Sequence, residues 1–146
     1  MFDRILVVCT GNICRSPMAE ILLQQQLQQA GRSVEVRSAG VGALVNYPAD
    51  APAQARMQTR GLELETHRAR QFTPELARWA DLILVMDATH REAVLDIEPA
   101  ARGKTFLLGH WIGGKEVPDP YKQPEEVYIQ VLDLIDEALA AWMKKL

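Results

Sequence analysis

Short apolar runs alternate along this chain with longer stretches in which apolar residues recur at helical spacing. Residues 4–8, 34–37, 82–86 and 105–108 are short, rich in aliphatic side chains and bounded by turn or polar residues, which predicts four strands. Strands that alternate with helices favour parallel pairing. The pattern therefore predicts an α/β fold: a single three-layer domain whose four-stranded parallel sheet, in the order 2-1-3-4, carries helices on both faces.

The stretches between the predicted strands have the spacing of amphipathic helices. Residues 18–30, 51–60 and 89–97 are predicted to be helical. Gly31 and Gly61 follow the first two stretches directly, where a glycine commonly ends a helix.

Two further helices are predicted from their start signals. Thr73 can cap a short helix whose first turn holds Pro74. A long closing helix begins near Pro124, because apolar residues recur there at intervals of three and four. This predicted core stripe consists of Val127, Val131, Leu134, Ile135, Ala138, Leu139 and Trp142.

Length and charge limit the classes of protein to which the chain can belong. Its 146 residues suffice for one domain, residues 1–146, and are too few for two comfortable ones. With 16 Lys and Arg against 19 Asp and Glu, the net charge of -3 gives no general attraction for nucleic acid. The apolar run at residues 5–8 is too short for a signal peptide core or a membrane span. We therefore expect a cytoplasmic protein without membrane insertion.

The stretch VVCTGNICRSP directly follows the first predicted strand and holds both cysteines of the chain. In open α/β sheets, ligands bind beyond the carboxyl ends of the strands, which is where this stretch falls. Gly11 allows the backbone to curl so that several N–H groups point inward. Ser16 and Pro17 are predicted to be the cap and the first turn of the following helix.

This stretch has the elements of an anion site. N–H groups at a helix N-terminus attract anions, and the planar guanidinium of Arg15 can grip two phosphate oxygens at once. The same surroundings would stabilise a thiolate at Cys9, which is the form of cysteine that attacks. The alternative is that Cys9 is simply a small buried hydrophobic residue.

Cys9, five intervening residues, Arg15 and then Ser16 resemble the signature loop of the low-molecular-weight protein tyrosine phosphatases. Further segments that follow in the family's order are Ser38-Ala39-Gly40, His67-Arg68-Ala69-Arg70-Gln71, Met86-Asp87 and Asp119-Pro120-Tyr121. The resemblance covers nearly the whole chain, and the pairing of the C-x5-R-S loop with a D-P-Y segment makes it specific.

The resemblance implies a role for individual residues. Cys9 is the expected nucleophile, Arg15 the catalytic phosphate-binding cation and Asp119 the general acid. Ser38 and His67 are implied to brace the loop, and Asn12 matches an asparagine that takes part in this bracing. The implied substrate-binding residues, which meet phosphate or another oxyanion and the substrate ring, are Thr10, Gly11, Asn12, Ile13, Cys14, Ser16, Leu44 and Tyr121. Neither a metal nor a cofactor is implied.

The chemistry of the named residues agrees with this assignment. Cleaving a tyrosyl phosphate expels a phenolate whose conjugate acid has a pKa of about 10, so a positioned carboxylic acid should speed its departure. Asp119 can supply that proton and then take one from water during hydrolysis of a phosphocysteine. Ser16 can donate a hydrogen bond to the sulfur as it leaves. Without Cys9 and Arg15, Asp119 would be an ordinary turn residue before proline.

Departures from the family pattern concern the substrate and the thiols. Animal relatives carry a tryptophan at the pocket rim, whereas residues 42–45 are aliphatic here and Leu44 takes that place. The chain is therefore similar to the bacterial branch associated with exopolysaccharide or capsule export, whose partner is a membrane tyrosine autokinase. Tyr47 is either a second aromatic wall or a surface loop residue. Lys122 stands where a second tyrosine often follows, and a basic rim would suit acidic phosphotyrosine clusters.

Cys14 matches a cysteine that can form a disulfide with the nucleophile in relatives, and its alternative role is packing beneath the loop.

Other interpretations of the sequence are weaker. The segment GHWIGGK, residues 109–115, has the glycine and lysine spacing of a nucleotide-binding loop, but Glu116 stands where Ser or Thr is needed. The three histidines lack metal-ligand spacing. A thioredoxin-coupled arsenate reductase would need cysteines after Cys14, and the chain has none. A noncatalytic phosphotyrosine-binding module would need Arg15 but neither Cys9 nor Asp119.

Overall fold

The computed structural model describes residues 2–146 and contains one parallel sheet. Its strands are β1 (Arg4–Cys9), β2 (Glu35–Gly40), β3 (Leu82–Val85) and β4 (Thr105–Leu107), in the order β2-β1-β3-β4. Every neighbouring pair is parallel, which confirms the predicted fold class and strand order. The side chains of residues 5–8 in β1 are fully buried, as expected for a continuous aliphatic run with helices on both faces.

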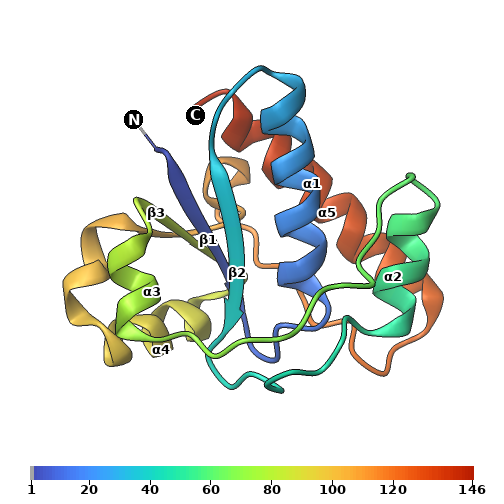
Figure 1. The fold of residues 1–146 in the computed structure, drawn as a ribbon, viewed down its shortest axis with the longest axis horizontal. Helices are drawn as coiled ribbons and strands as arrows, with labels where there is room; N and C mark the ends of the chain where they lie inside the picture. Colours follow the sequence, from blue (N-terminus) through green and yellow to red (C-terminus); the bar gives the residue numbers. More distant parts are fainter. Residues whose placement is uncertain (1) are drawn as a thin grey trace.

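Helices cover both faces of this sheet (Figure 1). One face carries α1 (Arg15–Gln29), α2 (Ala51–Gln58) and α5 (Glu125–Met143), and the other carries α3 (Pro74–Trp79) and α4 (Ala88–Ile97). Two short 3-10 helices complete the fold, η1 (Pro99–Lys104) and η2 (His110–Ile112). Alternate residues of β1 divide between the two cores: Ile5 and Val7 pack toward α1 and α5, and Leu6 and Val8 pack toward α3 and α4.

The predicted end of β2 is wrong by three residues, because the strand continues past Arg37 to Gly40. Its pairing with β1 extends to Cys9, which lies opposite Gly40. The backbones approach closely there: a Cβ on Gly40 would lie 2.3 Å from the Thr10 carbonyl oxygen. Ser38 therefore sits inside a strand rather than in a loop.

The predicted start of the first helix is also wrong. Helix α1 begins at Arg15 instead of residue 18, and its N-cap is Cys14, without a side-chain capping bond. Ser16 lies within the first turn, and its hydroxyl points inward to Asn12 and Cys9. The expected cap is absent because this hydroxyl has buried partners that compete with the helix N–H groups.

Other helix ends match their predicted signals. Gly31 and Gly61 follow α1 and α2 with φ of 70° and 74°, the left-handed conformation that ends helices. The Thr73 hydroxyl accepts a hydrogen bond of 3.2 Å from the Leu76 N–H and so caps α3.

Helix α5 buries the predicted stripe against α1 and the sheet. Val131, Ile135, Ala138, Leu139 and Trp142 are buried, and the two remaining members, Val127 and Leu134, are half-buried against the same core. The indole N–H of Trp142 donates to the Leu108 carbonyl at 2.8 Å. The stripe prediction omitted Tyr128, which is 1% exposed on this helix.

The glycine-rich segment 109–115 does not form a phosphate loop. It contains η2 and two glycines with positive φ, and an antiparallel bridge pairs Gly109 with Lys115. Lys115 Nζ lies 3.2 Å from Glu137 Oε1 on α5. The segment therefore has a different conformation from the loop between a strand and a helix that cradles phosphates in nucleotide-binding proteins.

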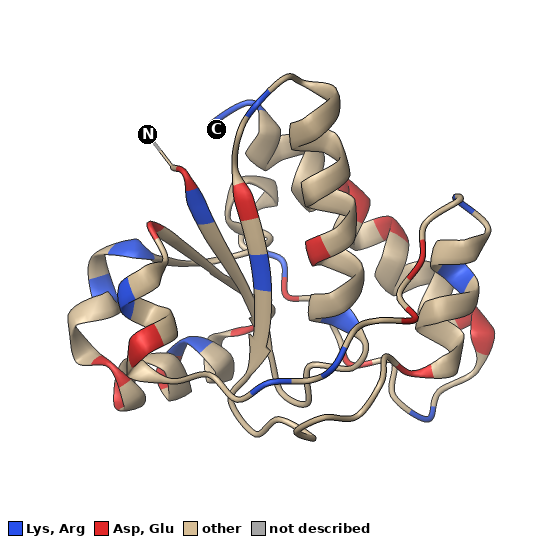
Figure 2. Cartoon of the chain, viewed as in Figure 1, with Lys and Arg blue, Asp and Glu red and all other residues tan. Residues whose placement is uncertain are grey.

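Basic and acidic side chains are interspersed over the elements of both helical layers (Figure 2), in keeping with the small net charge. Within residues 2–146, no helix combines the length and the hydropathy that crossing a membrane requires.

Candidate active site

The signature loop, residues 9–15, joins the carboxyl end of β1 to the first residue of α1 (Figure 1). Cys9 is 2% exposed at the base of a cavity of about 190 Å³. The Asn12 N–H donates to Cys9 Sγ at 3.3 Å, and Ser16 Oγ lies 2.9 Å from the same sulfur. Since a thiolate can only accept hydrogen bonds, Ser16 becomes the donor when Cys9 is ionised. Two donors therefore converge on this sulfur.

Arg15 is held at the cavity by the chain segment that carries Asp119. Its Nη1 donates to the Val117 carbonyl at 2.9 Å, and its Nη2 lies 3.8 Å from Asp119 Oδ2. Asp87 Oδ2 lies 3.9 Å from Nη1 on another side. The guanidinium is only 4% exposed, whereas the Asp119 side chain is 54% exposed. Arg15 is thus fixed in place, and the Asp119 carboxyl stands at the open mouth.

Most of the predicted substrate-binding residues line this cavity. The full set of lining residues is Cys9, Thr10, Gly11, Ile13, Cys14, Arg15, Gly42, Leu44, Asp119 and Tyr121. Leu44 and Tyr121, at 37% and 39% exposed, form an apolar rim as expected. Asn12 and Ser16 were expected to bind substrate, but both are fully buried beneath the loop, and their side chains do not line the cavity.

The Asn12 side chain links the loop to β2 and to the following segment. Its Nδ2 donates to Ser16 Oγ at 2.7 Å and to Ser38 Oγ at 2.9 Å, while its Oδ1 accepts from the Arg70 N–H at 3.0 Å. His67 Nε2 donates to the Asn12 carbonyl at 2.7 Å. Asn12 also has a φ of 60°, a conformation that asparagine tolerates better than most residues. Ser38 and His67, the two residues expected to brace the loop, thus both contact Asn12.

A model of the low molecular weight phosphotyrosine protein phosphatases matches residues 4–146 of the chain. The chain belongs to this family. It is a family of hydrolases, and the curated relatives of this chain are named protein-tyrosine-phosphatases. The relative Etp from Escherichia coli strain K12, a low molecular weight protein-tyrosine-phosphatase, is 46% identical over 145 residues, which cover 99% of this chain and 95% of Etp.

Solved phosphatase structures match the whole fold. Wzb from Vibrio vulnificus, in complex with benzylphosphonate, has a TM-score of 0.94 and 47% identity and covers 100% of both chains. The tyrosine phosphatase Wzb from Escherichia coli K30, in complex with sulphate, has a TM-score of 0.93 and 49% identity and covers 99% of both chains.

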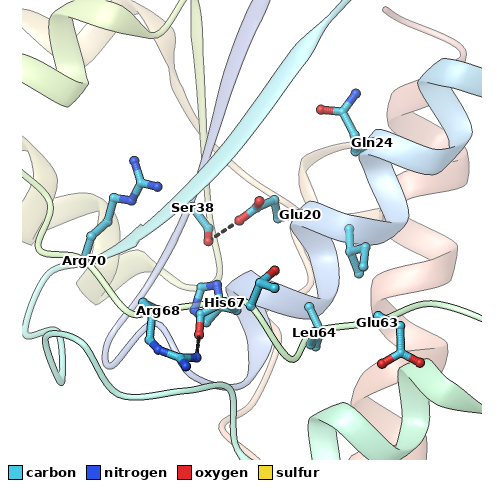
Figure 3. Close-up of a pocket in the computed structure, with 10 residues that line it drawn as sticks. Glu20, Gln24, Ser38, Glu63, Leu64, His67, Arg68 and Arg70 are labelled. Atoms are coloured by element: carbon cyan, nitrogen blue, oxygen red, sulfur yellow. Dashed lines mark hydrogen bonds between the residues drawn. The ribbon is translucent and has the colours of Figure 1, made fainter.

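Behind the loop of this phosphatase lies a second, polar cavity of about 320 Å³, between α1 and residues 63–70 (Figure 3). Glu20 points into it and accepts a hydrogen bond of 2.5 Å from Ser38 Oγ. Burial raises the pKa of the Glu20 carboxyl above its ordinary value of 4.5. The sequence analysis did not single out Glu20, although its position one helical turn after Ser16 is a signal that the two share a face.

Cys14 faces the protein interior and contacts two residues that the sequence analysis also missed. Its Sγ lies 3.2 Å from Tyr128 Oη on α5, and Tyr128 donates a hydrogen bond of 2.5 Å to Asp50 Oδ2. Burial raises the pKa of the Cys14 thiol to about 12, so Cys14 is a neutral thiol at pH 7. Both Cys9 and Cys14 are free.

His90 is a further residue behind the site. Its Nε2 forms a hydrogen bond of 2.7 Å with Thr10 Oγ1, and burial lowers the pKa of its imidazole. The side chain is 4% exposed and stays neutral at physiological pH.

Proposed function

We propose that this phosphatase hydrolyses phosphotyrosine in proteins through a phosphocysteine intermediate on Cys9. The observation that carries the proposal is the convergence in one small cavity of a sulfur with two hydrogen-bond donors, a buried guanidinium and an exposed carboxyl. The reaction requires a nucleophile, a cationic group that binds the phosphate and a proton donor.

In the first step, Cys9 Sγ attacks phosphorus, and the bond from phosphorus to the tyrosyl oxygen breaks. The Asp119 carboxyl gives its proton to that oxygen, which leaves as a phenol. Arg15 and the loop N–H groups bind the equatorial oxygens, where charge is spread in the transition state. The half-exposed position of Asp119 at the mouth supports this role, because the leaving oxygen points away from the buried sulfur.

In the second step, water attacks the phosphorus of phosphocysteine. The Asp119 carboxylate removes a proton from this water, the bond between sulfur and phosphorus breaks, and inorganic phosphate forms. Ser16 Oγ, 2.9 Å from the sulfur, donates to the departing thiolate, and so does the Asn12 N–H. Because these two hydrogen bonds stabilise the negative charge on the sulfur, the thiolate is a good leaving group.

The lining of the cavity supports an aryl phosphate as substrate. Ile13, Leu44 and Tyr121 give apolar surface to the same cavity that holds Cys9 and Arg15. The Vibrio vulnificus relative binds benzylphosphonate, an aryl group one carbon away from a phosphonate, and the Escherichia coli K30 relative binds sulphate. From the resemblance to the bacterial exopolysaccharide or capsule branch, we infer that the substrate is the phosphotyrosine of a membrane tyrosine autokinase. The enzyme would act in the cytoplasm, where a nucleophilic thiol stays reduced.

The test is metal-free hydrolysis, with EDTA present, of phosphotyrosine and phosphoserine peptides by wild type, Cys9→Ser and Asp119→Asn. We expect turnover selective for phosphotyrosine that is abolished in the cysteine variant and reduced about 100-fold or more in the aspartate variant. Rapid quenching of the wild-type reaction should trap phosphate on the protein. Wild type that binds phosphotyrosine without turnover would instead identify a noncatalytic binding module.

A further inference from the structure

Exposed apolar side chains gather beside the mouth of the catalytic cavity. Among the described residues, six large hydrophobic side chains are exposed, and four of them lie in two short segments there: Leu44, Val45 and Tyr47 in one and Tyr121 in the other. Tyr47 is the most exposed, at 57%. A concentration of this kind at a site marks a surface that a partner covers.

Another hollow, of about 330 Å³, lies next to the catalytic cavity and differs from the polar cavity that holds Glu20. We call it the side hollow. Tyr47, Pro48, Ala49 and Ala51 line it, and it shares Ile13 and Tyr121 with the catalytic cavity. Because consecutive Cα atoms are only 3.8 Å apart, a residue adjacent to a bound phosphotyrosine is within reach of a hollow that shares two walls with the catalytic cavity.

Two polar side chains of the side hollow form hydrogen bonds within the protein. Asp50 Oδ2 accepts a hydrogen bond from the Tyr128 hydroxyl, and Gln54 Nε2 donates to the Ala49 carbonyl at 2.8 Å. The rest of the lining is aliphatic or aromatic. An acidic side chain there would face the carboxylate of Asp50, which disfavours it. An apolar ring can pack against Tyr47, Pro48 and Ala49 without placing a like charge beside Asp50.

The walls of the side hollow are fixed by backbone hydrogen bonds. The Asp50 N–H donates to the Ile13 carbonyl at 2.8 Å, which ties the hollow to the signature loop. Tyr47 is held by its carbonyl, which accepts from the Ala69 N–H at 2.9 Å. A preformed hollow binds a side chain without first being ordered.

We propose that the side hollow is a specificity subsite that takes a large apolar or aromatic side chain directly next to the phosphotyrosine of the protein substrate. This inference rests on the proposed function, because it assigns the neighbour of the residue that the catalytic cavity binds. Tyr47 lines the side hollow and not the catalytic cavity, whereas Ile13 and Tyr121 line both.

The test compares phosphotyrosine peptides that differ only at the flanking residues: alanine on both sides, phenylalanine before, phenylalanine after, and aspartate in either place. We expect kcat/KM to rise about five- to tenfold for one phenylalanine peptide over the alanine peptide, mostly through KM. Aspartate in the same place should give no increase. Phenylalanine peptides that stay within twofold of the alanine peptide would overturn the proposal.

Two variants assign the preference to the side hollow. Tyr47→Ala removes a wall and Ala51→Leu fills the space, and each should bring the ratio of phenylalanine to alanine peptide toward one. Ile129→Ala is the matched control, because Ile129 is also an exposed apolar residue, at 39%, and lies on α5 outside the lining of both cavities. It should keep the wild-type ratio. A preference that survives in both Tyr47→Ala and Ala51→Leu would show that the side hollow is not its source.

Binding of the same peptides to Cys9→Ser, measured by calorimetry, separates the two proposals. If no peptide is hydrolysed by wild type but the phenylalanine peptide still binds more tightly to Cys9→Ser, the catalytic proposal fails and the subsite stands. Hydrolysis of every peptide at one rate, with equal dissociation constants, would leave the catalytic proposal intact and refute the subsite.

Discussion

Asn12 is the position at which the bracing of the loop can be measured most directly. Its side chain is fully buried and forms hydrogen bonds with Ser16, Ser38 and the Arg70 N–H. Asn12→Gly removes these three bonds and keeps a residue that accepts the φ of 60°. At about 1 kcal/mol net for each bond, the free energy of unfolding should fall by about 3 kcal/mol.

Asn12→Ala adds a backbone term to the same loss. Alanine in the left-handed region costs about 1 kcal/mol more than glycine, so this variant should be less stable than Asn12→Gly by about that amount. Asn46→Gly is a matched control, because Asn46 also has a positive φ, of 70°, but its side chain is exposed. Its substitution should change stability by less than about 0.5 kcal/mol.

Urea unfolding followed by circular dichroism measures these differences. With a slope of about 2 kcal/mol/M, the midpoint of Asn12→Gly should lie about 1.5 M below that of wild type. The kcat should also fall, because the Asn12 N–H that donates to Cys9 Sγ loses its fixed position. The reasoning is refuted if Asn12→Gly unfolds within about 0.5 M of wild type, or if it is no more destabilised than Asn46→Gly.

Three further predictions follow from single contacts. Burial raises the pKa of Glu20 above 4.5, so the native protein binds this proton more tightly than the unfolded chain, and ionisation costs stability as pH rises through the two values. The free energy of unfolding of Glu20→Gln, relative to that of wild type, should therefore be higher at pH 8 than at pH 4. Urea unfolding measures this difference, and an equal difference at both pH values would contradict the prediction. Lys122 Nζ lies 5.4 Å from the centre of the Tyr121 ring at the mouth, so Lys122→Glu should raise KM about threefold for a multiply phosphorylated peptide, and an unchanged KM would contradict the basic-rim hypothesis. Because Cys14 stays a neutral thiol, peroxide should oxidise Cys9 first and Cys14 should then condense with it. Recovery by thiol after peroxide should be lower in Cys14→Ser than in wild type, and equal recovery would exclude a protective disulfide.

Much of the fold follows from local sequence patterns. Four aliphatic runs specify strands that must be buried on both faces, and the glycines at 31 and 61 end two helices because their left-handed φ disfavours other residues. The signature stretch directly follows the first strand, so its location at the ligand-binding edge of the sheet was also predictable, since ligands bind beyond the carboxyl ends of parallel strands. The end of β2 and the start of α1 could not be predicted from the local sequence. The end of β2 depends on the close approach of Gly40 to the Thr10 backbone, and the start of α1 on the Ser16 hydroxyl, which turns inward to Asn12.

The sequence by itself determined the chemistry of the site, namely a thiol, a guanidinium and a carboxyl on segments that a parallel sheet brings to one edge. Tertiary structure alone decided the further supports that the sequence analysis did not name. Arg15 reaches the Val117 carbonyl across 102 positions, and Asp50 meets Tyr128 across 78. These contacts depend on how helices cross and on which face each side chain occupies, and nothing in the local spacing of Asp50 or Tyr128 encodes their meeting. The same packing brings Tyr47 and Tyr121 to one hollow. The sequence had left open whether Tyr47 is a second aromatic wall or a surface loop residue.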